Sequence, residues 1–363
     1  MATNTGLRYN PADRAPQNGA HARLAMLLRP TAILGMLTLI LCTGISLMHS
    51  APPSSHGILV VANQKEHTAL LIDPDTHKEI AKIPVGINGH EVTVDKAGKF
   101  AYVPIYGDSG VGRPGSDGST IDVIDIAARK LAYTIDLGKP LRPHDPHFGP
   151  DGLLYVTAEL SQSIDAIDPN TRKIVAEVPT GQDESHMFVI RPGPDRVTAY
   201  TANVHAGTVS VLDLGKRSLI KTIPVSKMVQ RISIQPDGLY VFTHDQESPR
   251  IVVIDPLSNA VSTYIDLPET VYSSEPTPDG HYLIAGGMKG HIFVIDLHTR
   301  KLFKTFDAPT ALAKTLVRPD GNVAYISFLT AGKIIVLDLK NWKLLPSIDL
   351  TPGVDGMDWA AAS

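Results

Sequence analysis

The chain has 363 residues, of which 43% are hydrophobic and 19% charged, and its formal net charge is −4. A charge this small, with no long basic run, gives no electrostatic basis for binding nucleic acid, so we expect no nucleic-acid partner. The one cysteine, Cys42, excludes a disulfide within the chain, and the sequence has no C-x-x-C-H motif for covalent haem.

An uncharged apolar stretch lies near the N-terminus, from Ala32 to Met48. At about 17 residues it reaches the lower limit for a membrane span. Arginines precede it, and no Lys or Arg follows it until Lys65. This asymmetry predicts that the N-terminus is cytoplasmic and that the rest of the chain lies outside. A cleaved signal peptide is the alternative interpretation of the same stretch.

We therefore expect three segments. Residues 1–30 form a disordered cytoplasmic N-terminus, residues 31–50 form a transmembrane anchor or signal segment, and residues 51–363 form the folded domain. The folded domain is then periplasmic or extracellular. It is either anchored to the inner membrane by one N-terminal helix or released after signal cleavage.

A repeated landmark divides the chain from Gly57 onward. Each copy has an apolar residue, then Ile or Leu, then Asp, and the seven aspartates are Asp73, Asp125, Asp168, Asp213, Asp255, Asp296 and Asp338. The first step between landmarks is about 52 residues and the other steps are about 42, which indicates a repeat architecture of seven units. The regular occurrence of these aspartates before polar turns favours a turn-forming role over a chemical one.

Each unit carries the same four short strands and no helical periodicity. The first strand ends in a Pro-Asp-Gly-type turn, the third ends at the landmark aspartate, and a polar turn leads to the fourth. Such units predict an all-β fold, a seven-bladed β-propeller of four-stranded blades, preceded by the N-terminal hydrophobic segment. The first unit begins at its second strand, 57–62, so we expect residues 356–360 to supply the missing strand and close the ring.

Three copies of the second strand carry related motifs: Ala101-Tyr-Val-Pro, Leu154-Tyr-Val-Thr-Ala and Ala199-Tyr-Thr-Ala-Asn. Over about residues 57–361 the sequence resembles the YVTN-repeat β-propeller family, also called YncE-like or surface-layer-like. The resemblance implies the propeller fold. Its members include ligand-binding, cell-surface, lactonase-like and cofactor-binding propellers, so it implies little about activity.

Alignment of the blades on the glycine of the Pro-Asp-Gly turn brings three histidines to one position, where the innermost strand opens at the top of the channel. They are His90, His144 and His186, and the next three blades have Gln230, Tyr272 and Ala313 there. Converging neutral imidazoles suit a divalent transition metal, Zn, Cu, Fe or Ni. The alternative is that these histidines only hydrogen-bond neighbouring blades.

Two further residues are candidates for chemistry on this top face. Glu159 follows a second strand and is a candidate fourth ligand or general base, and His147 is a second candidate for moving protons. The candidate ligand-binding residues are Tyr106, Arg113, His205, His244, Tyr272 and Glu275. For most of these, ordinary surface polarity is the simpler interpretation. The glycine-rich insertion 107–119 is a candidate lid beside the histidines.

Three functions fit these features. The first is an extracytoplasmic, metal-dependent enzyme, a lyase or a lactone/ester hydrolase, by analogy with other metal-bearing propellers. The second is a non-catalytic propeller that binds a small-molecule or surface ligand at its top face, displayed on a membrane by its N-terminal segment. The third is a redox propeller that binds a non-covalent haem-like cofactor.

Overall fold

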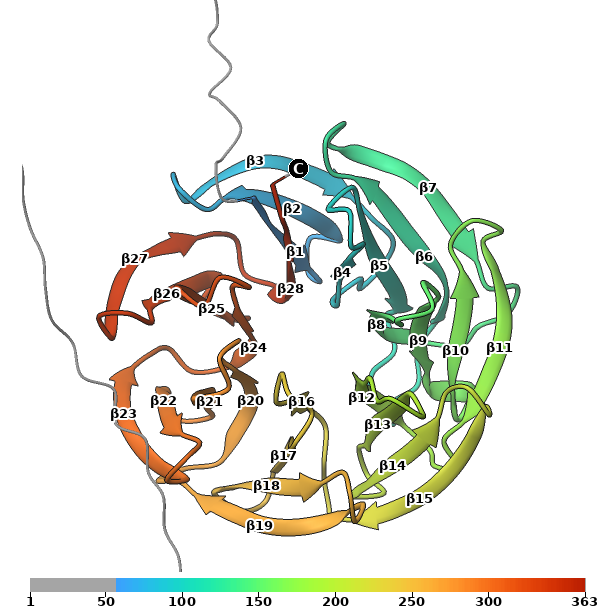
Figure 1. Cartoon of the computed structure of the whole chain (residues 1–363). Coiled ribbons are helices and arrows are strands. Elements are labelled where there is room, and N and C mark those ends of the chain that lie inside the picture. Colours follow the sequence, from blue (N-terminus) through green and yellow to red (C-terminus); the bar gives the residue numbers. More distant parts are fainter. Residues whose placement is uncertain (1–56, 363) are drawn as a thin grey trace, which may run out of the picture. The chain divides into compact units, whose positions relative to one another are not determined.

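The fold was analysed in a computed structural model that describes residues 57–362. These residues form seven four-stranded antiparallel sheets arranged as a ring, which confirms the predicted seven-bladed β-propeller (Figure 1). Among them no helix is long and apolar enough to cross a membrane. The predictions for residues 1–30 and 31–50 lie outside the described residues.

Each blade is built from strands that follow one another in the chain, except the first. The first blade contains β28 (Val354–Ala360), β1 (Ile58–Asn63), β2 (Thr68–Asp73) and β3 (Lys78–Pro84). The second to fourth blades contain β4 (Thr93–Val94), β5 (Phe100–Gly107), β6 (Asp117–Asp125) and β7 (Lys130–Asp136); β8 (Pro143–Phe148), β9 (Leu154–Ala158), the 3-10 helix η1 (Glu159–Ser161), β10 (Ser163–Asp168) and β11 (Lys173–Pro179); and β12 (Ser185–Arg191), β13 (Thr198–Asn203), β14 (Thr208–Asp213) and β15 (Ser218–Pro224). The fifth to seventh contain β16 (Ile232–Ile234), β17 (Val241–Asp245), β18 (Arg250–Asp255) and β19 (Ala260–Asp266); β20 (Val271–Pro276), β21 (Tyr282–Gly287), β22 (His291–Asp296) and β23 (Lys301–Asp307); and β24 (Leu312–Val317), β25 (Val323–Phe328), β26 (Lys333–Asp338) and β27 (Lys343–Asp349).

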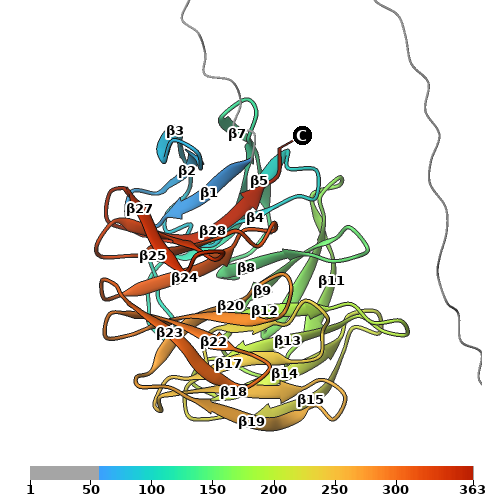
Figure 2. The same cartoon turned by 60° about the vertical axis from the view of Figure 1, so that its left-hand side comes forward.

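The ring closes as the sequence predicts, because β28 pairs with β1 as the innermost strand of the first blade. Trp359 lies opposite Leu59 and Met357 opposite Val61 in this antiparallel pair. Both views place β28 (red) beside β1 (blue) (Figures 1 and 2). The two distant parts of the chain thereby share one sheet, and β1 has no free inner edge.

The hydrophobic core is divided into clusters that lie between neighbouring blades. One cluster joins Leu59 and Leu70 of the first blade to Tyr325 and Ile334 of the seventh. Another joins Val60 of the first blade to Val103 of the second. Residues of both faces of a sheet are therefore buried, which is why the middle strands are nearly continuous apolar runs rather than alternating ones.

The landmark aspartates form turns, as predicted. Each accepts a hydrogen bond from a backbone N–H two or three residues later in the turn between its third and fourth strands. Four residues after each aspartate the backbone is left-handed, at His77, Arg129, Arg172, Arg217, Asn259, Arg300 and Trp342. This conformation disfavours residues other than glycine.

The side chains at several of these left-handed positions contact the preceding blade. The Arg172 guanidinium lies 3.7 Å from the centre of the Tyr133 ring, and Asn259 Oδ1 accepts a hydrogen bond of 2.8 Å from the Tyr200 hydroxyl. In the same way the Trp342 ring packs 4.7 Å from that of Tyr282. We call these contacts the hairpin latches; they give a reason for a large side chain where glycine would fit more easily.

A truncation in β28 tests whether ring closure stabilises the fold. Met357→Ala is expected to lower the free energy of unfolding by about 2–5 kcal/mol, because it leaves a cavity at a side chain that is 2% exposed. The control, Leu344→Ala on the outer strand β27, removes a side chain that is 42% exposed and should change it by about 0.5 kcal/mol or less. Chemical denaturation measures both. Equal effects would contradict the closure described above.

Candidate functional site in the central channel

The innermost strands bulge at the point where the candidate residues lie. In β8, Pro143 pairs with Ala158 and Pro146 with Val156, so His144 and Asp145 together face one residue of β9. Equivalent register shifts occur in β12, β20, β24 and β28. A bulge lets consecutive side chains leave the strict alternation of a strand. Two successive residues of a blade can therefore both contribute to the channel.

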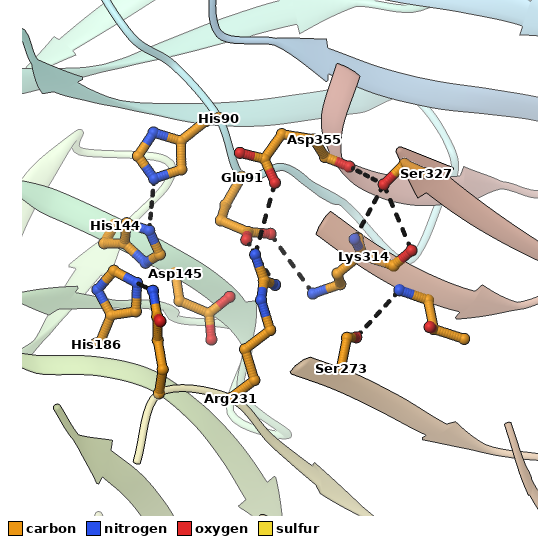
Figure 3. Close-up of polar contacts among 12 residues, drawn as sticks. His90, Glu91, His144, Asp145, His186, Arg231, Ser273, Lys314, Ser327 and Asp355 are labelled. Carbon is orange, nitrogen blue, oxygen red and sulfur yellow. Dashed lines mark hydrogen bonds and ion pairs between the residues drawn. The ribbon is translucent and has the colours of Figure 1, made fainter. Parts of the chain in front are cut away.

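The three predicted histidines lie together, and we call them the histidine cluster (Figure 3). His90 Nε2 lies 2.6 Å from His144 Nε2. The rings of His144 and His186 are stacked, with their centres 3.7 Å apart. His144 and His186 are 2% and 3% exposed, so these contacts are made away from bulk solvent.

Hydrogen bonds fix how two of the imidazoles are oriented. His90 Nδ1 lies 3.1 Å from the Asn88 carbonyl oxygen, which can only accept a proton. His186 Nδ1 lies 2.5 Å from Glu159 Oε1, and the other oxygen of Glu159 accepts a bond of 2.5 Å from the Tyr106 hydroxyl. With both Nδ1 atoms donating, the Nε2 atoms of His90 and His186 are acceptors, and they face His144 Nε2 and Gln230 Nε2.

Two of the three imidazoles, those of His90 and His144, are neutral around neutral pH. Burial lowers the pKa of His90 to about 4, although the Glu91 carboxylate opposes it. Burial, with His186 and His90 nearby, also holds the pKa of His144 well below its usual value. Burial likewise raises the pKa of the Tyr106 phenol, helped by the Glu159 carboxylate, so its hydroxyl stays protonated and donates.

The cluster is not closed around a single point. Two imidazoles on one Zn²⁺, each about 2.0–2.1 Å from it, would place their nitrogens about 3.3 Å apart in tetrahedral geometry. The His90–His144 pair is tighter than that, and His186 Nε2 lies 3.1 Å from Gln230 Nε2 instead. Among residues 57–362 no group of three or more His, Cys, Asp and Glu side chains is arranged to hold a metal ion.

A second group of polar residues, the channel ion network, lies beside the histidines (Figure 3). Its members are Glu91, Arg231, Lys314 and Asp355. Glu91 accepts a 3.1 Å hydrogen bond from Arg231 Nη1 and faces Lys314 Nζ at 3.5 Å. Burial opposes ionisation of Glu91, but Lys314 and Arg231 lower its pKa overall.

Several polar atoms in this region lack a partner among the described residues. They are Arg231 Nε, Asp355 Oδ1 and His144 Nδ1, all on side chains that are nearly inaccessible to solvent. Arg231 Nη2 is 3.5 Å from Asp355 Oδ1, which is long for a hydrogen bond. Unpaired buried polar atoms are costly, so this cluster of them indicates a place where water or a ligand binds.

Further along the channel lie His147 and Glu275. His147 Nε2 is 3.0 Å from Asp145 Oδ2; burial opposes its charging, but this carboxylate raises its pKa overall. Burial raises the pKa of Glu275 to about 7, although Lys314 and His147 pull it down. His147 is thus paired with a carboxylate, a separate dyad from the histidine cluster.

The structure brings some predicted ligand-binding residues to the channel and leaves others away from it. Tyr272 lies in the channel wall, 4.9 Å from the Arg231 guanidinium. His244 is fully buried and bonds Ser274 Oγ at 2.8 Å. His205 has an exposed side chain bonded to Glu184, and Arg113 is exposed on the insertion. The last three make no described contact with the histidine cluster.

The Arg142 side chain contacts the insertion 107–119 at three residues. Arg142 donates to Asp117 Oδ1 at 2.5 Å and to the carbonyl oxygens of Gly110 and Arg113 at 3.1 and 3.0 Å.

Glu159, a predicted base or ligand, has both its carboxylate oxygens engaged, because they accept hydrogen bonds from Tyr106 and His186. Its position suits orienting His186.

Two depressions of about 400 Å³ lie between neighbouring blades, at the Pro-Asp-Gly-type turns that end the inner strands. One is lined by Tyr282, Asp279 and Trp342, and the other by Tyr240, Asp237 and Arg300. The first contains the latch between Trp342 and Tyr282, and in the second the Arg300 guanidinium lies 5.0 Å from the centre of the Tyr240 ring. We interpret both as grooves that recur between blades, because residues at equivalent positions of the repeat line them.

Sequence reasoning missed the charged residues of the channel. Glu91, Asp145, Arg231 and Lys314 each directly follow an aligned candidate position. A regular strand would turn such neighbours to the opposite face. The signal that could have found them is the occurrence of charge at this second position in four blades, where a buried strand should be apolar.

No family model matches this chain, and no curated protein matches it. Solved structures resemble it in fold. The chain is 18% identical to a chain of Kuenenia stuttgartiensis hydrazine synthase, with a TM-score of 0.66, covering 81% of this chain and 99% of that one. It is 13% identical to a functionally unknown protein from Desulfotomaculum acetoxidans, with a TM-score of 0.67, covering 85% and 100%. At such identities the likeness is one of fold alone.

The raised pKa of Glu275 gives a pH-dependent prediction. The unfolded chain ionises near 4.5 and the folded chain near 7, so the stability contributed by protonated Glu275 is present below 4.5 and is lost as the pH rises to 7. Glu275→Gln should therefore be more stable than the wild type at pH 8, with a smaller difference at pH 5. Urea denaturation at both values measures this.

The control for this measurement is Glu79→Gln on the outer strand β3, where the side chain is exposed. It should follow the wild type at both pH values. If Glu275→Gln also follows the wild type throughout, Lys314 and His147 compensate the effects of burial and of Asp358 on Glu275 fully, and the prediction is wrong.

Proposed function

We propose that this chain is a metal-binding propeller, in which His90, His144 and His186 take up one divalent transition metal, Zn, Cu, Fe or Ni, at the top of the channel. The observation that carries this proposal is the hydrogen bonding of the Nδ1 atoms. Asn88 and Glu159 hold them, so the Nε2 atoms of His90 and His186 are the acceptor nitrogens, which now face His144 Nε2 and Gln230 Nε2. Metal-ligating histidines are commonly held in this way by a carbonyl or carboxylate.

Two further observations support a binding role over a purely structural one. The low pKa values keep His90 and His144 neutral, which is the form that binds metals. The other blades have Gln230, Tyr272 and Ala313 at this position, so the propeller fold itself does not need histidine there. Occupation by a metal requires the His90–His144 pair to open slightly and His186 to turn from Gln230.

For the activity we propose a metal-dependent lyase or a lactone/ester hydrolase. A bound metal ion would polarise a carbonyl oxygen or lower the pKa of a water molecule. Glu159 and Tyr106 would orient His186, because both Glu159 oxygens are already engaged. The His147–Asp145 dyad is then the remaining candidate for moving a proton.

We also propose membership of the YVTN-repeat family and an extracytoplasmic location. The tyrosine-containing motifs of the second strands support the first, and the arginines before the apolar stretch support the second. The likeness to hydrazine synthase supports the fold and adds nothing on the reaction.

Metal content tests the proposal directly. The purified full chain, loaded with each candidate metal and dialysed, should retain about one ion per chain, and His90→Ala and His144→Ala should lose it, because each removes a nitrogen ligand. His205→Ala, an exposed histidine outside the cluster, is the control. Plasma mass spectrometry measures the metal, and circular dichroism checks the fold of each variant.

Retention of metal by both cluster variants, or no metal in the wild type, would overturn the proposal. The channel would then serve as a ligand- or partner-binding surface. A strong visible absorption band of the purified protein would favour the haem-like alternative.

The role of Glu159 gives a separate prediction. Glu159→Gln should weaken metal binding about 10–100-fold, because an amide cannot accept from both Tyr106 and His186. Competition with a chelator measures the affinity. Glu184→Gln, which alters only the carboxylate bonded to His205, should leave it unchanged. Equal affinities in all three proteins would exclude the orienting role.

A further inference from the structure

The channel ion network contains more hydrogen-bond donors than acceptors. Arg231 and Lys314 each carry several N–H groups, whereas the one carboxylate that they share is Glu91. Among the described residues, Lys314 Nζ has one ion-pair contact, at 3.5 Å, and Arg231 Nε has no hydrogen-bond partner. An Arg231 side chain that is 6% exposed cannot satisfy these donors with bulk water.

The nearby acids do not fill this need. Asp145 is engaged by His147 and by the backbone N–H of Phe188, at 3.0 and 2.9 Å. Burial and the Glu91 carboxylate raise the pKa of Asp355 to about 7, so its carboxylate is a weak counter-ion near neutral pH. Near the two cations, the donors therefore outnumber the acceptors that are left to them.

The cations converge from separate blades toward one point beside the histidines. Arg231 precedes β16 and Lys314 lies on β24, and their charged ends both face Glu91 (Figure 3). Glu91 directly follows His90 in the chain and contacts Arg231, which places this point beside the histidine cluster. Lys314 is 19% exposed, so solvent and small solutes can reach this point.

We propose that Arg231 and Lys314 form a subsite for the carboxylate group of a small organic acid, bound beside the histidine cluster. The Nε–H of the Arg231 guanidinium has no partner among the described residues and can donate to a carboxylate, and the ammonium group of Lys314 supplies a second donor. This inference names the class of ligand that would bind beside the proposed metal site. Only the placement of that ligand next to a metal ion rests on the proposed function. Its own test does not require a metal.

The charge of the channel favours a carboxylate over a phosphate. Two acidic side chains, Glu91 and Asp145, already lie beside the two cations, and Glu91 contacts both of them (Figure 3). A doubly charged oxyanion would meet stronger repulsion from these groups than a singly charged one. A single carboxylate group therefore fits this place better than a phosphate.

Calorimetric titration of the full chain tests the subsite. The protein is first freed of metal with phenanthroline, a chelator without carboxylates, and dialysed, and then titrated with lactate, succinate, inorganic phosphate or methylammonium. We expect at least one carboxylate to bind in the millimolar range or tighter, and methylammonium not to bind. Lys314→Gln should weaken carboxylate binding about tenfold or more, since charge-assisted hydrogen bonds are lost.

Two variants keep this test decisive. Lys227→Gln, whose side chain is 83% exposed, should bind as the wild type does. Lys314→Gln should retain metal in the separate metal assay, so loss of metal binding and loss of the anion subsite are distinguishable. Binding of phosphate alone, no binding of any carboxylate, or equal carboxylate binding by Lys314→Gln and the wild type would overturn the inference.

Discussion

Every blade of this propeller depends on its two neighbours, because both faces of each sheet are buried in clusters shared between blades. An open row of such sheets would expose an apolar face at each end and an unpaired edge on β1. The pairing of β28 with β1 removes both exposures at once. The channel has defined walls only when that pairing is made, so the position of every candidate residue follows from it.

Within the closed ring, the bulges decide what the channel contains. They place charged residues directly next to the histidines, and the low pKa values of His90 and His144 follow from burial among these groups. Buried charges are tolerated where they are paired, and Glu91 is the residue that pairs with both cations. The polar channel is thus one electrostatic unit, in which a change at one member alters the ionisation of the others.

The sequence was sufficient for the fold because a seven-fold landmark with its turns leaves one architecture that buries every strand. It also aligned His90, His144 and His186 correctly, since a repeat transfers a position from blade to blade. It could not indicate the register shift in β24, which depends on packing between blades, so Lys314 was missed. Arg231 was missed because it lies just before β16, outside the aligned strand. The place of His244 near a strand end likewise says nothing of its complete burial.

The hairpin latches give the ring a direction. Arg172, Asn259 and Trp342 each reach back to an aromatic side chain of the blade before their own, at Tyr133, Tyr200 and Tyr282. Each reaching side chain lies later in the chain than its aromatic partner. In a chimera made from two such propellers, a boundary between the sixth and seventh blades would therefore take Tyr282 from one parent and Trp342 from the other.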